Sequence, residues 1–183
     1  MCANFVNRKR SERMLSIMPL IAWTDQMCVG VKLLDNDHKK LVLLINELHE
    51  GIVNNRDKQA LDSVFENLVR FTRVHFAHEE QLLFETGYPA AAAHKQEHES
   101  MIQKILALQA RFRSGAPMAM HMDGVELLKS WLFSHMYGAD QDYAPYLEAK
   151  GVNSILTSWE TPIGVIQEKP DDRPKVTQGS RPS

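Results

Sequence analysis

The chain has 183 residues, a length that suits one domain with enough chain to bury a core. Its formal net charge of −2 gives no basic field for nucleic acid, and no apolar run approaches the roughly 20 residues that span a bilayer. The two cysteines do not make a disulfide framework, which favours reduced thiols and a cytoplasmic location. The unusual feature of the composition is its eight histidines.

The two ends of the chain differ in composition from its middle. Residues 1–18 are polar and basic over most of their length and are expected to form a flexible extension, with Met18 an alternative start to Met1. The apolar stretch that follows is short, is interrupted by Pro19 and lacks a cleavage site, so we do not interpret it as a signal peptide. Residues 22–37 are expected to form an extended arm with apolar contacts. Residues 151–183 are polar and proline-rich, which is typical of a disordered tail.

Apolar residues recur every three or four positions in four segments of the middle part, residues 19–150, and this spacing predicts amphipathic helices. The segments run from about Asp37 to Val53, Lys58 to Thr86, Pro89 to Ser114, and from Pro117 past His135. A short extra helix is expected over Asp142–Lys150. Short loops join the segments, so we predict an all-α, up-down-up-down four-helix bundle with an N-terminal extended arm and a disordered C-terminal tail.

Ionisable residues occupy positions in these apolar stripes that elsewhere hold Leu, Ile, Phe or Met. Burying an imidazole or a carboxylate costs several kcal/mol unless it is paired or bound to metal. Residues four apart lie on one helix face, and up-and-down connectivity brings stripes from successive helices to the same end of the bundle. Six such residues come from all four helices, and together they predict a metal site: His38, His75, Glu79, His94, His98 and His135.

Asp140 is a seventh candidate, with an ordinary surface aspartate as the alternative. It follows His135 by five residues, about 140° around a continuous helix, so it shares the face only if the helix ends or deforms between them. Gly138 permits such a deformation. Five imidazoles and two carboxylates are too many ligands for one ion and suit two octahedral ions bridged by the carboxylates. Iron, manganese and zinc all accept this ligand set, and redox use would favour iron.

The other histidines, and the acidic residues close to the ligands in sequence, are expected to face away from the site. The acidic residues would be solvated or would make surface ion pairs, which contribute little stability. These residues are His49, His78, His121, Glu80, Glu97 and Glu99.

The order and spacing of the candidate ligands resemble the hemerythrin family. The shared pattern is His38, then His75-Phe76-x-x-Glu79-Glu80, then Tyr88-Pro89-x4-His94-x3-His98, then Trp131-x3-His135-x4-Asp140. The resemblance covers roughly residues 19–150 and includes all seven ligand positions.

This resemblance implies a non-haem centre of two Fe ions that binds O2 reversibly. It assigns three ligands to one iron, His94, His98 and His135, and two to the other, His38 and His75, with Glu79 and Asp140 bridging. With a bridging hydroxide, one coordination position stays open on the two-histidine iron, where O2 can enter. An apolar lining for the O2 pocket, which would equally be core packing, is expected from Leu41, Phe76, Trp131, Leu132 and Met136.

The function implied by the resemblance is O2 storage, or delivery to an oxygen-consuming enzyme, by a monomeric protein that is not itself an enzyme. The alternatives are a di-iron peroxidase, oxidase or nitric-oxide-scavenging enzyme, and an O2 sensor or iron store. The histidine-rich ligand set favours a carrier, because O2-activating di-iron proteins of the ferritin type use mainly glutamates. Sensing would normally need an output domain, and neither terminal segment resembles one.

Overall fold

The computed structural model describes residues 18–115 and 118–152. The flexible extension expected over residues 1–18 and the tail expected over residues 151–183 therefore lie almost wholly outside the described residues. The described part contains one short 3₁₀ helix and five α-helices. They are η1 (Asp25–Met27), α2 (Lys32–Val53), α3 (Lys58–Thr86), α4 (Ala91–Arg113), α5 (Met118–Tyr137) and α6 (Ala139–Ala149).

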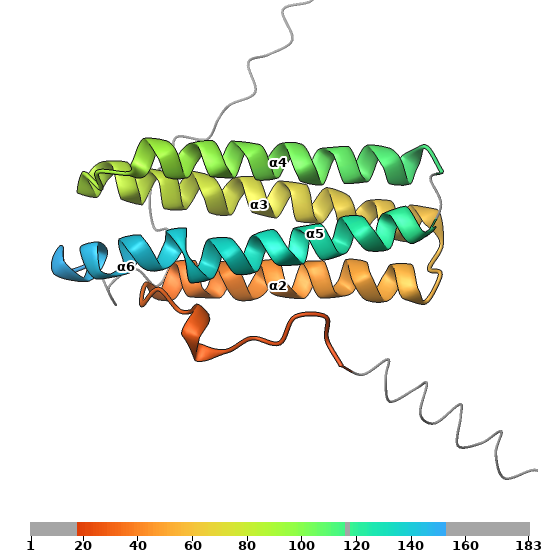
Figure 1. The fold of residues 1–183 in the computed structure, drawn as a ribbon, viewed down its shortest axis with the longest axis horizontal. Helices are drawn as coiled ribbons and strands as arrows, with labels where there is room; N and C mark the ends of the chain where they lie inside the picture. Colours follow the sequence, from red (N-terminus) through yellow and green to blue (C-terminus); the bar gives the residue numbers. More distant parts are fainter. Residues whose placement is uncertain (1–17, 116–117, 153–183) are drawn as a thin grey trace, which may run out of the picture.

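Helices α2, α3, α4 and α5 form an up-down-up-down bundle, with α6 continuing beyond the end of α5 (Figure 1). Each helix of the bundle packs on its two neighbours, since α2 contacts α3 and α5, and α4 also contacts both. The predicted all-α four-helix bundle is confirmed. None of the described helices is long and apolar enough to cross a membrane.

Two predicted helix starts were wrong, and both helices begin earlier. Helix α2 begins at Lys32 instead of about Asp37. Asp35 lies in the first turn of α2, where its negative charge interacts favourably with the helix dipole. Its Oδ1 accepts a hydrogen bond of 2.7 Å from Val29 N of the arm. Helix α6 begins at Ala139 instead of Asp142.

Helix α3 has the bounds that its sequence predicts, and local chemistry explains both ends. Asp57 caps the start, because its side chain accepts hydrogen bonds of 3.0 Å from the backbone N–H groups of Gln59 and Ala60. Gly87 ends the helix in the left-handed region with φ 74°, which glycine adopts without steric cost.

The N-terminal arm runs along the bundle from residue 18 to α2 and contains η1 (Figure 1). Asn46 of α2 holds it through two hydrogen bonds of 2.8 Å, accepting one from Ile21 N and donating one to Ile21 O. Ile21 and Met27 are buried. The arm is therefore part of the packed structure.

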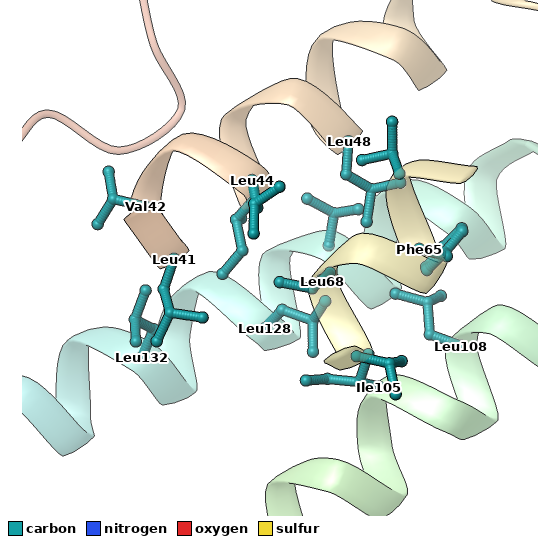
Figure 2. Close-up of a cluster of buried hydrophobic side chains, with 14 of the residues drawn as sticks. Leu41, Val42, Leu44, Leu48, Phe65, Leu68, Ile105, Leu108, Leu128 and Leu132 are labelled. Atoms are coloured by element: carbon teal, nitrogen blue, oxygen red, sulfur yellow. The ribbon is translucent and has the colours of Figure 1, made fainter. Parts of the chain in front are cut away.

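The apolar core has two parts, and the candidate ligands lie between them. The large core is built from all four bundle helices around residues such as Leu48, Phe65 and Leu108 (Figure 2). The small core lies at the α6 end and consists of Val29, Val31, Leu34, Leu82, Leu83, Ala91, Tyr143 and Leu147. On α2, for example, His38 falls between Leu34 of the small core and Leu41 of the large core. A layer of ionisable side chains thus separates two apolar volumes.

Candidate metal centre

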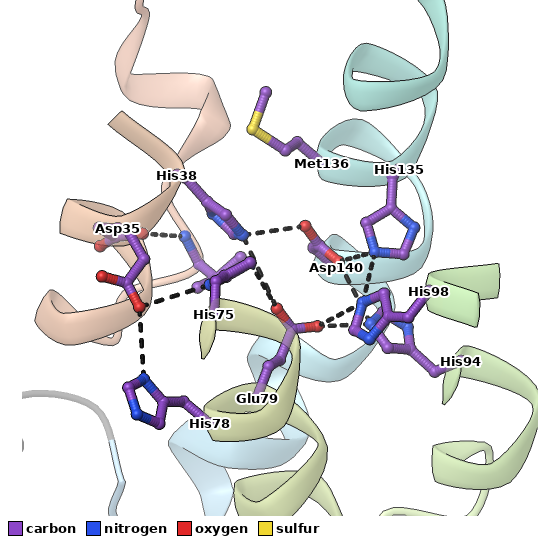
Figure 3. A network of polar contacts seen from close by, with 12 residues as sticks. Asp35, His38, His75, His78, Glu79, His94, His98, His135, Met136 and Asp140 are labelled. Atoms are coloured by element: carbon purple, nitrogen blue, oxygen red, sulfur yellow. Dashed lines mark hydrogen bonds and ion pairs between the residues drawn. The ribbon is translucent and has the colours of Figure 1, made fainter. Parts of the chain in front are cut away.

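The structure brings all seven candidate ligands together inside the bundle (Figure 3). None of the seven is more than 4% exposed: His38, His75, Glu79, His94, His98, His135 and Asp140. They come from α2, α3, α4, α5 and α6.

The side chains form two groups that share Glu79. The first is His38, His75 and Glu79, and the second is Glu79, His94, His98 and His135, with ligand atoms within 4.8 Å of one another in each. Glu79 Oε2 lies 3.2 Å from His75 Nε2 and 3.8 Å from His38 Nε2. Its other oxygen, Oε1, lies 3.6 Å from His98 Nε2 and makes a short contact with His94 Nε2. One oxygen of Glu79 therefore serves each group.

Asp140 repeats this arrangement from the opposite side. Its Oδ1 lies 3.1 Å from His135 Nε2 and 3.6 Å from His94 Nε2, while Oδ2 lies 3.4 Å from His38 Nε2. The break between α5 and α6 makes this placement possible. Gly138 stands at the break, and a Cβ added there would lie 2.8 Å from Ser134 O, closer than a side chain tolerates.

Several buried nitrogen and oxygen atoms of this cluster have no hydrogen-bond partner within the described part of the chain. They are both ring nitrogens of His38, Glu79 Oε2 and both carboxylate oxygens of Asp140. Such atoms are costly to bury unless something binds them. Oxygen and imidazole nitrogen donors in two groups joined by two carboxylates suit a pair of divalent cations. The chemistry of the residues therefore fits the two metal ions that the resemblance implies.

Burial and neighbouring charges set the protonation of the histidines. Burial lowers the pKa of His135 to about 2 and also lowers the pKa values of His38 and His98. Burial acts in the same direction on His75, but its contacts with Asp37 and Glu79 outweigh it and raise the pKa of His75 to about 9. A histidine binds metal as the neutral imidazole, and the raised pKa of His75 disfavours that form.

The two shared carboxylates differ in the direction of their pKa shifts. Burial raises the pKa of Glu79, but the nearby rings of His38, His75 and His94 outweigh it and hold that pKa well below its usual value. Burial and the charge of Glu79 raise the pKa of Asp140 well above its usual value. A bound cation favours the ionised form of both groups.

A second set of carboxylates, which the helical spacing did not predict, contacts the outward-facing Nδ1 atoms of three histidines. Asp37 Oδ2 lies 3.5 Å from His75 Nδ1, Glu80 Oε1 lies 3.1 Å from His98 Nδ1, and Glu97 Oε2 lies 3.2 Å from His135 Nδ1. Carboxylates in this position orient a metal-binding imidazole and fix its tautomer. The available signal was adjacency, because each of these acids is next to a candidate ligand in the sequence.

The expected surface positions were only partly correct. Glu99 is exposed and lies 3.7 Å from Lys95, a surface ion pair as expected. Glu80 and Glu97 were expected to make surface pairs at most, which misses their contacts with His98 and His135. The surface position expected for His121 was wrong, because its ring is buried 5.3 Å from that of Phe112.

An apolar cavity adjoins the histidine groups. Four of the five predicted lining residues surround it, namely Leu41, Phe76, Trp131 and Leu132, together with side chains of the large core and Thr72. Its volume, counted as the space that the centre of a water-sized molecule can occupy, is about 20 Å³, which is enough for one small molecule. Met136 is fully buried but does not line this cavity.

Two walls of the cavity stack on candidate ligands. Phe76 lies parallel to the His98 ring, with centroids 3.6 Å apart and an interplanar angle of 3°. Trp131 lies over the His135 ring at 4.4 Å and 16°. Two walls of the cavity therefore pack directly on histidines of the second group.

Comparisons with known proteins agree with this architecture. The family model "Hemerythrin HHE cation binding domain" matches residues 29–147. Bacteriohemerythrin of Stenotrophomonas maltophilia (strain R551-3) is 34% identical over 132 residues, covering 72% of this chain and 84% of the relative. Bacteriohemerythrin of Pseudomonas aeruginosa (strain LESB58) is 36% identical over 126 residues, covering 69% and 80%. A crystal structure of wild-type hemerythrin superposes with a TM-score of 0.63 at 27% identity, covering 69% of this chain and 96% of that chain. With its sequence, fold and buried histidine–carboxylate cluster all in agreement, the chain belongs to the hemerythrin family.

Proposed function

We propose that this protein binds O2 reversibly at a non-haem di-iron centre and stores it, or delivers it to an oxygen-consuming enzyme. The proposal includes a monomeric protein that works in the cytoplasm and is not itself an enzyme. One observation carries it: two buried histidine groups share two carboxylates and adjoin an apolar cavity of small-molecule size.

The ligand assignment follows the two groups. His94, His98 and His135 would hold one iron, His38 and His75 the other, and Glu79 and Asp140 would bridge them. The geometry supports this assignment, because one oxygen of each carboxylate faces each group. When bound, the two irons would supply the electrons for reversible O2 binding.

The residues around the site favour binding over turnover. Leu41, Leu132 and the other lining side chains exclude water, and dry walls limit loss of reactive species. Phe76 and Trp131 hold two imidazoles by stacking. Among the described residues, the cavity lining contains no carboxylate, imidazole or amine to act as a general acid or base, and Thr72 supplies its only hydroxyl.

The test is a cycle of loading and unloading. The full chain is loaded anaerobically with ferrous iron, exposed to O2 and then returned to anaerobic conditions, while iron is counted and the visible spectrum is followed. We expect two irons per chain and a charge-transfer band that appears with O2 and disappears on its removal over repeated cycles. Zinc-loaded protein is the matched control and should show no band. A band that decays in one turnover with formation of product would replace the carrier by the enzyme alternative.

A further inference from the structure

A surface cleft between α3 and α4 leads to the outer edge of His98. Its lining includes Glu80, Lys95 and His98. At its floor, Glu80 is held from two sides, with Oε1 3.1 Å from His98 Nδ1 and Oε2 2.5 Å from Lys95 Nζ. The Glu80 side chain is only 14% exposed, whereas Lys95 is 44% exposed. A surface cation is thus linked through one carboxylate to a candidate metal ligand.

The contact with Glu80 dictates which nitrogen of His98 carries the proton. A carboxylate paired with a lysine accepts hydrogen bonds and cannot donate one, so a bare Nδ1 at 3.1 Å would place two acceptors against each other. With the proton on Nδ1, the lone pair of Nε2 points into the site. His98 Nε2 lies 3.0 Å from His135 Nε2, so a proton in this contact comes from His135, whose Nε2 also lies 3.1 Å from Asp140 Oδ1.

His135 has a weaker outer partner. Its Nδ1 lies 3.2 Å from Glu97 Oε2, but Glu97 is 53% exposed, and no lysine or arginine in the described part of the chain pairs with it. Water can replace Glu97 there, and an exposed ion pair contributes little. Of these two histidines, His98 therefore has the fixed tautomer and His135 the adjustable one.

We propose that Glu80, balanced by Lys95, is the positioning residue that fixes His98 as its Nδ1–H tautomer and makes it the preorganised ligand of the three-histidine group. The role rests on the proposed metal centre. Lys95 keeps the carboxylate charged and in place, so that the Nε2 lone pair of His98 is aimed before a cation arrives. Outer partners of this kind typically change metal affinity 10- to 100-fold when they are removed.

The first test reads the tautomer directly. Long-range ¹H–¹⁵N correlation spectra of the metal-free full chain should show the proton of His98 on Nδ1 and that of His135 on Nε2. In Glu80→Gln, His98 should lose this preference, whereas Glu97→Gln should leave it in place. A His98 ring protonated on Nε2 in the wild-type chain would overturn the proposal, whether or not the protein binds iron.

The second test measures metal affinity by competition with a chelator. Glu80→Gln should weaken ferrous and zinc binding by about 10-fold or more, and Glu97→Gln by clearly less. Lys95→Met should weaken it too, while Lys104→Met, which removes the same charge from an exposed position on α4, should not. Equal affinities for Glu80→Gln and Glu97→Gln would refute the positioning role. Failure of the wild-type chain to bind iron would instead refute the proposed function, which keeps the two distinguishable.

Discussion

Glu79 and Asp140 occupy equivalent places between the two histidine groups, yet their environments push their pKa values apart. The surrounding ring nitrogens lower the pKa of Glu79, whereas burial and the charge of Glu79 raise the pKa of Asp140. His75 is the opposite case among the histidines, because Asp37 and Glu79 keep it protonated to about pH 9. The metal-free site therefore holds protons near neutral pH that a cation has to displace.

Metal binding is accordingly expected to release protons and to tighten as the pH rises from about 6.5 to 9. His75 titrates above its ordinary value, so its protonation stabilises the metal-free fold below pH 6.5, and that contribution is lost as the pH rises through about 9. Calorimetric titration with zinc in buffers of different ionisation enthalpy measures the release. The Asp140→Asn variant has no carboxyl proton at this position, so metal binding to it should release fewer protons. An affinity that is unchanged over this pH range would contradict the prediction.

At the scale of the elements, the sequence predicted most of what places the site. The period of the apolar stripes placed six candidate ligands on helix faces, and Gly138 indicated the break that admits Asp140. Adjacency to candidate ligands singled out Asp37, Glu80 and Glu97 but could not assign their contacts, because adjacent side chains point in different directions. Their partners depend on how neighbouring helices are rotated. The start of α2 was predicted several residues too late. Asp35 lies inside the first turn of the helix, and its side chain accepts a hydrogen bond from Val29 N of the arm, a contact that depends on the folded structure.

Close approach of α4 and α5 offers a test of packing between elements. A Cβ added at Gly124 would lie 2.2 Å from Leu108 Cδ1, so Gly124→Ala should overpack the core and destabilise the fold by about 1–2 kcal/mol after its gain in helix propensity. In a Leu108→Ala background the same substitution has space and should be neutral or stabilising. Chemical denaturation of the four proteins of this double-mutant cycle measures the coupling. Additive effects would contradict the predicted contact.

For the whole molecule, the candidate ligands come from every helix of the bundle, so metal binding and folding should be linked. A cation that binds only the folded chain at 100 times its Kd stabilises the fold by about 2.7 kcal/mol. His75→Ala should lower the iron content and lose most of this gain in melting temperature, since it removes a ligand of the two-histidine group. His49→Ala, a substitution outside the cluster, should behave as the wild type. Unchanged iron content and melting temperature in His75→Ala would refute the assignment.

The division of the core into a large and a small part has a consequence for how the site is filled. The small core covers one side of the ligand layer, and it is formed by the ends of α2, α3 and α4 together with α6 and the arm. Cooperative units of this size open more readily than the body of a domain. Opening at this end would admit a hydrated ion to half-assembled ligands while the rest of the bundle remained intact. The folded protein could then take up metal through local opening at the small-core end, and closure of this end would complete the coordination sphere.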